Sequence, residues 1–140
     1  MAADRPRGSG KPIERLLTAA ALDLDLARRA LVDPPNVLAA NHLHQAAEKI
    51  LAAVRIHRGL LNTKDHDLEI LIEGRPTGEP RPLPVGDVWR ARFDDSLREL
   101  SAYATTFRYS LKPAPNIDEL RMILAKLNAL HMTATHELLA

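Results

Sequence analysis

The sequence predicts an all-α protein, an antiparallel up-and-down bundle of four long helices and one short helix. The hydrophobic residues make up 46% of the chain, and most are alanine and leucine, which favour helix. Only 4% of the residues are aromatic, which disfavours a β-sandwich or barrel. Apolar residues also recur at spacings of three and four over long stretches, as on the buried face of a helix. We expect one helical domain at 12–140 after a flexible leader at 1–11.

Two long helices are predicted in the first half of the chain. The first covers 12–32, starts on a proline that suits a first turn, and stops before Pro34 and Pro35. The second covers about 37–58 and ends at Gly59. One side of it is rich in alanine, which predicts close helix packing, and we expect its polar side to face solvent. The polar residues are Asn41, His42, His44, Gln45, Glu48, Lys49 and Arg55.

The second half of the chain is predicted to hold a short helix, a long loop and two further helices. The short helix starts after Asp65 and ends near residue 73, and the prolines at 74–86 then favour an exposed loop. The next helix is predicted over 87–109, and the last over 117–138 behind an asparagine with the spacing of a capping box. The apolar stripe of the helix at 87–109 consists of Trp89, Phe93, Leu97, Leu100, Ala104 and Phe107.

The composition also excludes several classes of function. Because the chain has no cysteine, it cannot form a disulfide, a thiolate nucleophile or a cysteine-based zinc site. The formal charge of +1 gives no global field that would attract DNA or an anionic membrane. The first ten residues lack the apolar region of a signal peptide, and no run approaches the roughly 20 apolar residues of a membrane span. These features predict a cytoplasmic protein without a membrane partner.

Histidine spacing argues against a metal site. Two helical metal ligands need a spacing of three or four to share a face, and none of the histidine pairs has it. The chain also lacks the glycine-rich phosphate loops and the GxSxG signature of serine hydrolases. We therefore expect no metal, no cofactor and no nucleophilic triad. The six histidines are His42, His44, His57, His66, His131 and His136.

Three short strings occur in order on the predicted elements. They are His44-Gln45-Ala46-Ala47-Glu48-Lys49, then His66-Asp67-Leu68, and finally Phe107-Arg108-Tyr109. Together they resemble the HEPN family, the higher eukaryotes and prokaryotes nucleotide-binding domain. In that family, a helix with a Gln-Ala-Ala-Glu-Lys signature precedes a Thr-His-Asp-Leu turn and an Arg-Tyr pair on another long helix. The resemblance extends from about Ile13 to Leu138.

The resemblance implies a helical bundle that is often a homodimer, encoded beside a minimal nucleotidyltransferase as half of a toxin-antitoxin pair. It also implies a site that binds a nucleotide or RNA, where Lys49 and Arg108 neutralise phosphate and Tyr109 stacks on a base. Glu48 and Asp67 would orient these cations or a histidine. The matching positions are Gln45, Glu48, Lys49, His66, Asp67, Arg108 and Tyr109.

The same residues also suit a purely structural network. Lys49 could pair with Glu48 or Asp67, and Arg108 with a carboxylate, as ion pairs that fix helix register. Asp67 could instead serve the N-terminus of the short helix. Both interpretations can hold at once.

One departure from the family bears on catalysis. Ribonuclease members of the superfamily carry an arginine, four to six intervening residues and a histidine, and no pair here fits. Arg58 and His66 are separated by seven residues, and Lys126 replaces the arginine before His131. Ala52 also stands where the family often has lysine. We therefore predict no catalytic residues and favour binding. The alternatives are a non-catalytic protein-interaction or dimerisation module, and a metal-independent ribonuclease that uses His66 or His131.

Overall fold

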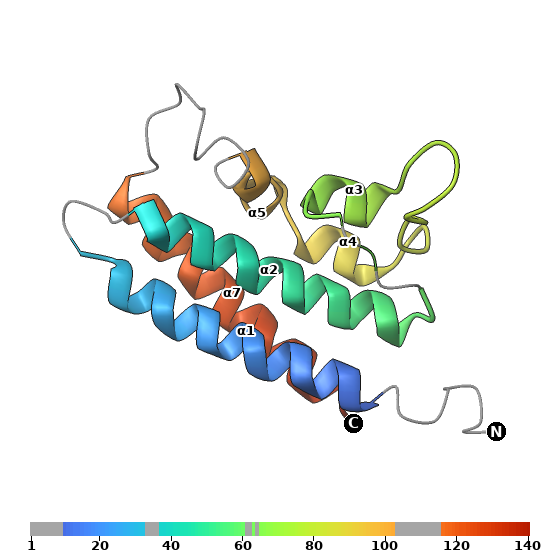
Figure 1. Cartoon of the computed structure of the whole chain (residues 1–140), viewed down its shortest axis with the longest axis horizontal. Helices are drawn as coiled ribbons and strands as arrows, with labels where there is room; N and C mark the ends of the chain where they lie inside the picture. Colours follow the sequence, from blue (N-terminus) through green and yellow to red (C-terminus); the bar gives the residue numbers. More distant parts are fainter. Residues whose placement is uncertain (1–9, 33–36, 61–62, 64, 103–115) are drawn as a thin grey trace.

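Every regular element in the described part of the chain is a helix, which confirms the all-α fold class (Figure 1). None of these helices has the length and apolar character needed to span a membrane. The computed structural model describes residues 10–32, 37–60, 63, 65–102 and 116–140.

Three long helices form the body of the bundle. They are α1 (Gly10–Ala30), α2 (Val37–His57) and α7 (Ile117–Leu138), and each packs against the other two. Figure 1 shows that α1 runs opposite to both α2 and α7. The predicted bounds of these helices agree with the structure within about two residues. Helix α1 begins at Gly10, so the last two residues of the predicted leader belong to the helix.

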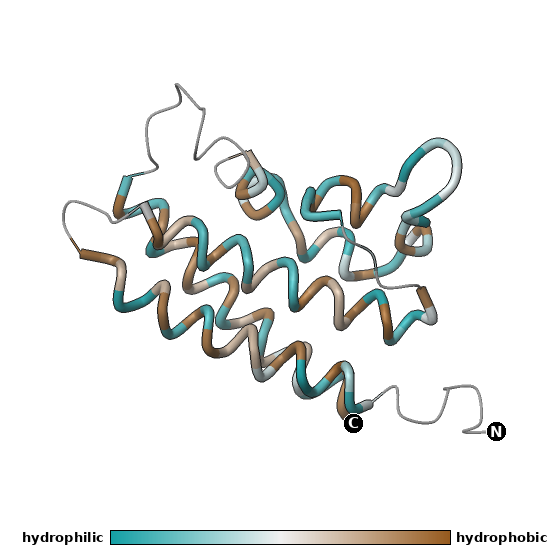
Figure 2. Tube along the Cα trace, viewed as in Figure 1, coloured by the Kyte–Doolittle hydropathy of each residue, from teal (hydrophilic) through white to brown (hydrophobic). Residues whose placement is uncertain are grey.

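Small residues recur every seven positions where α1 and α2 pack together. The alanine-rich side predicted for α2 is buried, and hydrophobic residues recur along all three long helices (Figure 2). Because alanine is small, both backbones can approach closely along this seam. The fully buried small residues at this spacing are Ala20 and Ala27 on α1, and Ala39, Ala46 and Ala53 on α2.

The predicted long helix at 87–109 is interrupted in the structure. In its described part it is replaced by α4 (Val88–Arg92), α5 (Asp95–Arg98) and a helical stretch at 100–102, and Phe93 leaves helical geometry with a ψ of 82°. The physical reason is Asp94, whose carboxylate accepts a hydrogen bond from the Leu97 backbone N–H and thereby starts a new helix. Phe93 and Leu97 are nevertheless buried, so the apolar pattern survives the break. The part of the prediction at 103–109 lies outside the described residues.

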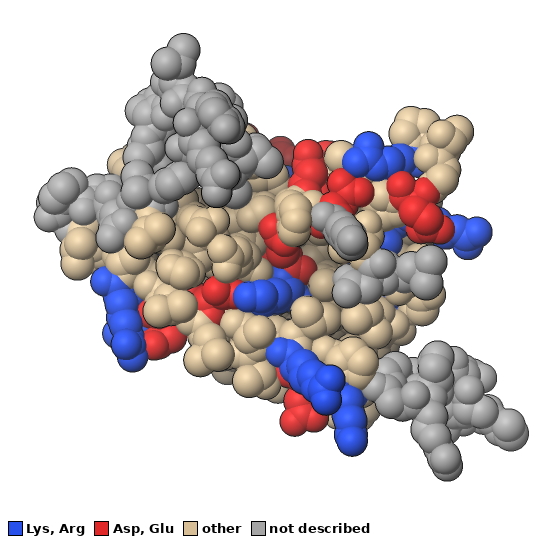
Figure 3. Space-filling view, in the orientation of Figure 1, with Lys and Arg blue, Asp and Glu red and all other residues tan. Residues whose placement is uncertain are grey.

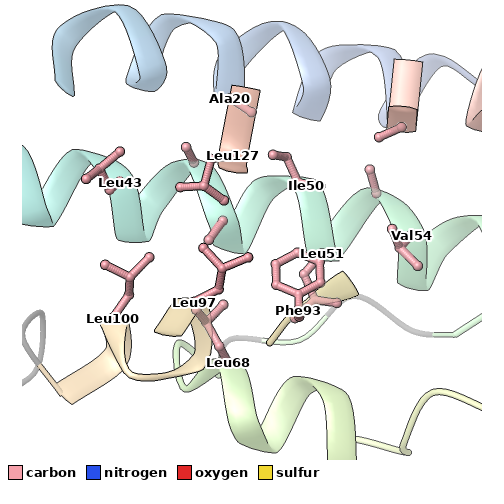
Figure 4. Packing of buried hydrophobic residues seen from close by; sticks show 14 of the residues in the cluster. Ala20, Leu43, Ile50, Leu51, Val54, Leu68, Phe93, Leu97, Leu100 and Leu127 are labelled. Carbon is pink, nitrogen blue, oxygen red and sulfur yellow. The ribbon is translucent and has the colours of Figure 1, made fainter. Parts of the chain in front are cut away.

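A second layer covers the side of α2 that was expected to face solvent. It consists of α3 (Leu68–Glu73), α4 and α5, and Figure 4 shows its apolar residues packed beneath α2. The prediction of a solvated polar side is therefore wrong for His44 and Arg55, which are only 3% and 1% exposed. Helix α2 lies between two layers.

The proline-rich segment at 74–86 contains no helix and most of it is exposed, but Pro80 and Leu83 are buried, unlike the fully exposed loop that was predicted. It folds back on α3, because the Leu83 backbone N–H donates to the Ile72 carbonyl at 2.9 Å. Gly74 has a φ of 75°, and a Cβ there would lie 2.7 Å from the ring of Pro82. Only glycine fits this tight return of the loop.

The asparagine predicted to cap the last helix, Asn116, does so by accepting a hydrogen bond from the Glu119 N–H at 2.8 Å.

Candidate functional site

A pocket of about 140 Å³ lies between α2 and the segment that leads into α3. It brings together three of the predicted site residues, Glu48, Lys49 and His66, from two different elements. Glu48 and Lys49 are adjacent on α2, and His66 lies on the turn before α3. The lining residues are Leu16, Glu48, Lys49, Ala52, Arg55, Thr63, Asp65, His66 and Leu71.

His44 does not line this pocket, but it contacts two residues that do, Glu48 and His66. Its Nδ1 lies 2.9 Å from a carboxylate oxygen of Glu48, and its Nε2 lies 2.9 Å from the backbone carbonyl oxygen of His66. Both of these oxygens are hydrogen-bond acceptors, and the two ring nitrogens reach one each. A buried imidazole thus joins α2 to the turn that carries His66.

Glu48 joins two histidines. One carboxylate oxygen faces His44, and the other accepts a hydrogen bond from His66 Nδ1 at 3.0 Å. Burial alone would raise the pKa of Glu48, but the hydrogen bonds from the two histidines outweigh burial and hold this pKa below its ordinary value. The His66 side chain is 73% exposed. With Nδ1 donating to the carboxylate, Nε2 is the nitrogen that His66 offers to a ligand.

Lys49 forms an ion pair with Asp23 on α1, rather than with Glu48 or Asp67 as the structural alternative expected. Asp23 is 5% exposed and also lies 3.6 Å from Nδ1 of His42. Sequence reasoning missed Asp23 as part of the site. The signal was present, because Asp23 occupies a position on the apolar stripe of α1, where a carboxylate needs a cationic partner.

Arg55 lies at the base of the pocket and anchors two distant segments. Its guanidinium donates to the backbone carbonyls of Leu71 at 2.9 Å and Arg81 at 2.6 Å. Burial lowers the pKa of Arg55, although the negative charges of Glu79 and Asp65 act in the opposite direction. These bonds explain why this arginine does not face solvent as predicted: α3 and the proline-rich loop cover it.

Two other predicted site residues do not line the pocket. Asp67 is the N-cap of α3 and accepts a hydrogen bond from the Glu69 N–H at 2.9 Å, which is the structural role named as its alternative. The sequence predicts that this helix starts after Asp65, whereas its N-cap in the structure is Asp67. Gln45 is partly buried on α2 and does not line the pocket. Arg108 and Tyr109 lie outside the described residues.

Ser101 is a further residue that sequence reasoning missed. Its hydroxyl accepts a hydrogen bond from the Leu68 N–H at 2.8 Å and lies 3.3 Å from His44 Nε2. The turn at 66–68 is therefore fixed by side chains from α2 and from the segment after α5. His131, in contrast, has its Nε2 at 2.8 Å from the Leu17 carbonyl and connects α7 to α1.

The electrostatic character of this face is mixed. Figure 3 shows basic and acidic side chains next to one another rather than a continuous basic surface. In the described segments, no group of three or more metal-binding side chains is arranged to hold a metal ion. What the pocket offers chemically is an ammonium group, an oriented imidazole and nearby carboxylates.

The fold and the pocket together define an all-helical domain with a polar pocket beside its central helix. The chain matches the model of the HEPN domain family over residues 13–136, which covers nearly its whole length and includes every predicted site residue. The protein therefore belongs to the HEPN family. No curated protein matches the chain, and no solved structure does.

Proposed function

We propose that this HEPN protein binds a phosphate group of a nucleotide or an RNA strand in the pocket between α2 and the turn before α3. The observation that carries the proposal is that Lys49 and His66, from separate elements, line one pocket. The ammonium group of Lys49 supplies positive charge, and Nε2 of His66 donates a hydrogen bond to a phosphate oxygen when the ring is protonated on both nitrogens. Arg108 is proposed to add a bidentate cation, and Tyr109 to stack on a base.

The hydrogen bonds around His66 support this proposal because they reduce the cost of binding. Glu48 holds the ring, and His44 holds the backbone carbonyl of the same residue. A side chain that is already oriented loses little freedom when a ligand binds. Asp23 keeps the Lys49 ammonium at the pocket, where a phosphate oxygen can share it.

Calorimetric titration tests the binding proposal. ATP, GTP and a short RNA are added to the wild type and to the Lys49→Ala and Arg108→Ala variants. We expect binding to the wild type and at least about tenfold weaker binding to each variant, since one charged hydrogen bond accounts for about 1.5–3 kcal/mol. The control is Arg121→Ala, an exposed cation on α7, which should bind like the wild type. Absence of binding at millimolar ligand, or unchanged affinity of Lys49→Ala, would refute the proposal.

A second candidate function is metal-independent cleavage of RNA, and the Glu48–His66 hydrogen bond favours it. An imidazole that donates Nδ1–H to a carboxylate can accept a proton at Nε2, here from the 2′-hydroxyl of RNA. Of the two histidines considered from the sequence, His66 is the exposed one, whereas Nε2 of His131 faces a backbone carbonyl. Labelled RNA should be cleaved by the wild type and not by His66→Ala. Intact RNA in the wild-type reaction would eliminate this candidate.

The partner is proposed from family membership. We propose that the chain forms a homodimer or associates with a nucleotidyltransferase, as one half of a toxin-antitoxin-like pair. Exposed apolar side chains, Leu22 on α1 and Met132 on α7, offer surface for such contacts. Light scattering of the purified protein measures the dimer, and the neighbouring gene shows the candidate partner. A monomer at all accessible concentrations, together with no nucleotidyltransferase gene nearby, would contradict the proposal.

A further inference from the structure

Helix α7 carries a second apolar stripe besides the one that faces the core. The buried stripe includes Leu120, Ile123 and Leu127. On the opposite side of the helix, apolar residues recur at spacings of three, four and three, and all of them are exposed. Apolar residues at this spacing are typical of a helix that packs along another helix. The exposed residues are Met122, Ala125, Ala129 and Met132.

This exposed pattern is the same when it is followed in either direction along α7. A methionine stands at each end, and an alanine stands at each inner position. Four residues beyond the methionines, the pattern continues with an exposed aspartate at one end and an exposed histidine at the other. The arrangement is therefore symmetric about residue 127. We call these six residues the outer stripe: Asp118, Met122, Ala125, Ala129, Met132 and His136.

The symmetry makes the outer stripe complementary to itself. If two copies of α7 lie antiparallel about a two-fold axis near residue 127, each residue meets the one at the same distance beyond the axis. The alanines allow close approach at the centre, and methionine side chains adapt to one another on either side. A carboxylate faces an imidazole at both ends. The pairs are Ala125 with the partner's Ala129, Met122 with the partner's Met132, and Asp118 with the partner's His136.

The basic residue beside the centre of the outer stripe does not oppose this pairing. Lys126 would come close to the same residue of a second copy, and two like charges would repel. Its ammonium group is directed away from the stripe, however, because it donates to Asp94 at 2.8 Å and to Ser96 at 2.9 Å. The carboxylate of Asp94 thus offsets the charge of Lys126.

We propose that the outer stripe of α7 binds a second copy of this chain as an antiparallel helix pair. The observation that carries this proposal is the symmetry of the stripe, because a face that binds an unrelated partner needs no such symmetry. It rests on the homodimer proposed above, and it adds the surface, the direction and the register of the contact.

The size of the outer stripe sets the expected strength of the dimer. From Asp118 to His136 the stripe extends about 27 Å, and a helix is about 10 Å wide. Such a surface is smaller than the roughly 800 Å² per partner that a stable complex buries. We therefore expect a dimer that dissociates in the range of about 1–100 µM.

Sedimentation equilibrium of the full chain at about 10–500 µM measures this dimer. Met132→Lys should raise the dissociation constant at least about tenfold, because two-fold symmetry brings the new charge into the interface twice. Leu22→Lys is the matched control, because Leu22 is 64% exposed on α1 and lies outside the outer stripe. Met132 is 72% exposed, so we expect both variants to fold.

Disulfide cross-linking tests the register, since the chain has no cysteine of its own. The Ala125→Cys and Ala129→Cys variants are mixed under mild oxidation, and one of them carries a size tag. We expect the mixed dimer to cross-link at least about threefold faster than either variant with itself, because the two positions face each other across the axis. Val85→Cys, at a residue that is 94% exposed outside α7, is the control and should cross-link slowly.

The outcomes separate the α7 contact from the homodimer itself. A wild type that is monomeric at every concentration overturns both. A dimer that tolerates Met132→Lys, or that shows no preference for the mixed cross-link, keeps the homodimer and overturns the α7 contact. A dimer weakened by Met132→Lys and not by Leu22→Lys, with the mixed cross-link preferred, supports it. If circular dichroism shows that Met132→Lys is unfolded, the cross-linking result decides alone.

Discussion

The two faces of α2 differ in how they hold the molecule together. One face carries Ala46 and Ala53, which are fully buried and allow α1 to approach closely. The other carries His44, Glu48 and Arg55, which hydrogen-bond to α3 and to the turn before it. Apolar packing depends on shape and tolerates many sequences, whereas buried polar groups must each find a partner. The alanine face thus sets the architecture, and the polar face sets the position of the pocket.

The largest effect is expected from removing apolar volume beneath the polar face. Phe93 is fully buried between α4 and α5 and packs toward Leu51 of α2 (Figure 4). Phe93→Ala should lower the free energy of unfolding by about 3–5 kcal/mol, because it leaves a cavity. Chemical denaturation measures the loss. Val85→Ala is the control, because Val85 is 94% exposed and its loss should cost less than about 0.5 kcal/mol. A cost below about 1 kcal/mol for Phe93→Ala would show that the second layer is loosely packed.

A smaller effect is expected from Arg55, which connects the polar face to the proline-rich loop. Arg55→Met keeps much of the apolar length of the side chain but leaves the carbonyls of Leu71 and Arg81 without their donor. We expect a loss of about 2–3 kcal/mol and faster amide hydrogen exchange at 71–83. Arg75→Met removes only an exposed ion pair and should cost about 0–1 kcal/mol. Equal effects of the two substitutions would contradict an anchoring role for Arg55.

The smallest of these changes tests the charge on the polar face. Because the pKa of Glu48 is lower in the folded protein than the ordinary value of 4.5, its stabilising effect is present above pH 4.5 and disappears as the pH falls through the folded-state value. Glu48→Gln should therefore be about 1–2 kcal/mol less stable than the wild type at pH 7, and the difference should shrink in acid. Glu14→Gln, an exposed change on α1, should give no such pH dependence. A difference that is constant from pH 7 to pH 3 would argue against a charged Glu48.

Helix periodicity predicted the architecture well because it follows directly from burial. The stripes of α1, α2 and α7 are buried as expected, and even the apolar spacing across Phe93 was correct. The break at Asp94 was not predicted, because an aspartate in a helical pattern can either face solvent or cap a new helix. Which of these occurs depends on tertiary contacts that the spacing does not contain.

The site was predicted only in part, for a related reason. The family strings led to Glu48, Lys49 and His66, which do line one pocket. The partners Asp23 and Ser101 were missed because they come from distant segments, and a helical wheel describes only one helix at a time. Arg55 was assigned to solvent because a wheel cannot show that a second layer covers the polar side.

The most direct measurement of the central claim is NMR of the histidine side chains during titration with a short single-stranded RNA. The ring signals of His66 should shift and saturate with the ligand, because its Nε2 is the nitrogen offered to the pocket. His136, which is exposed on α7 and does not line the pocket, should not move. Saturable binding that leaves His66 unchanged, or that shifts both histidines equally, would contradict a phosphate site at this pocket.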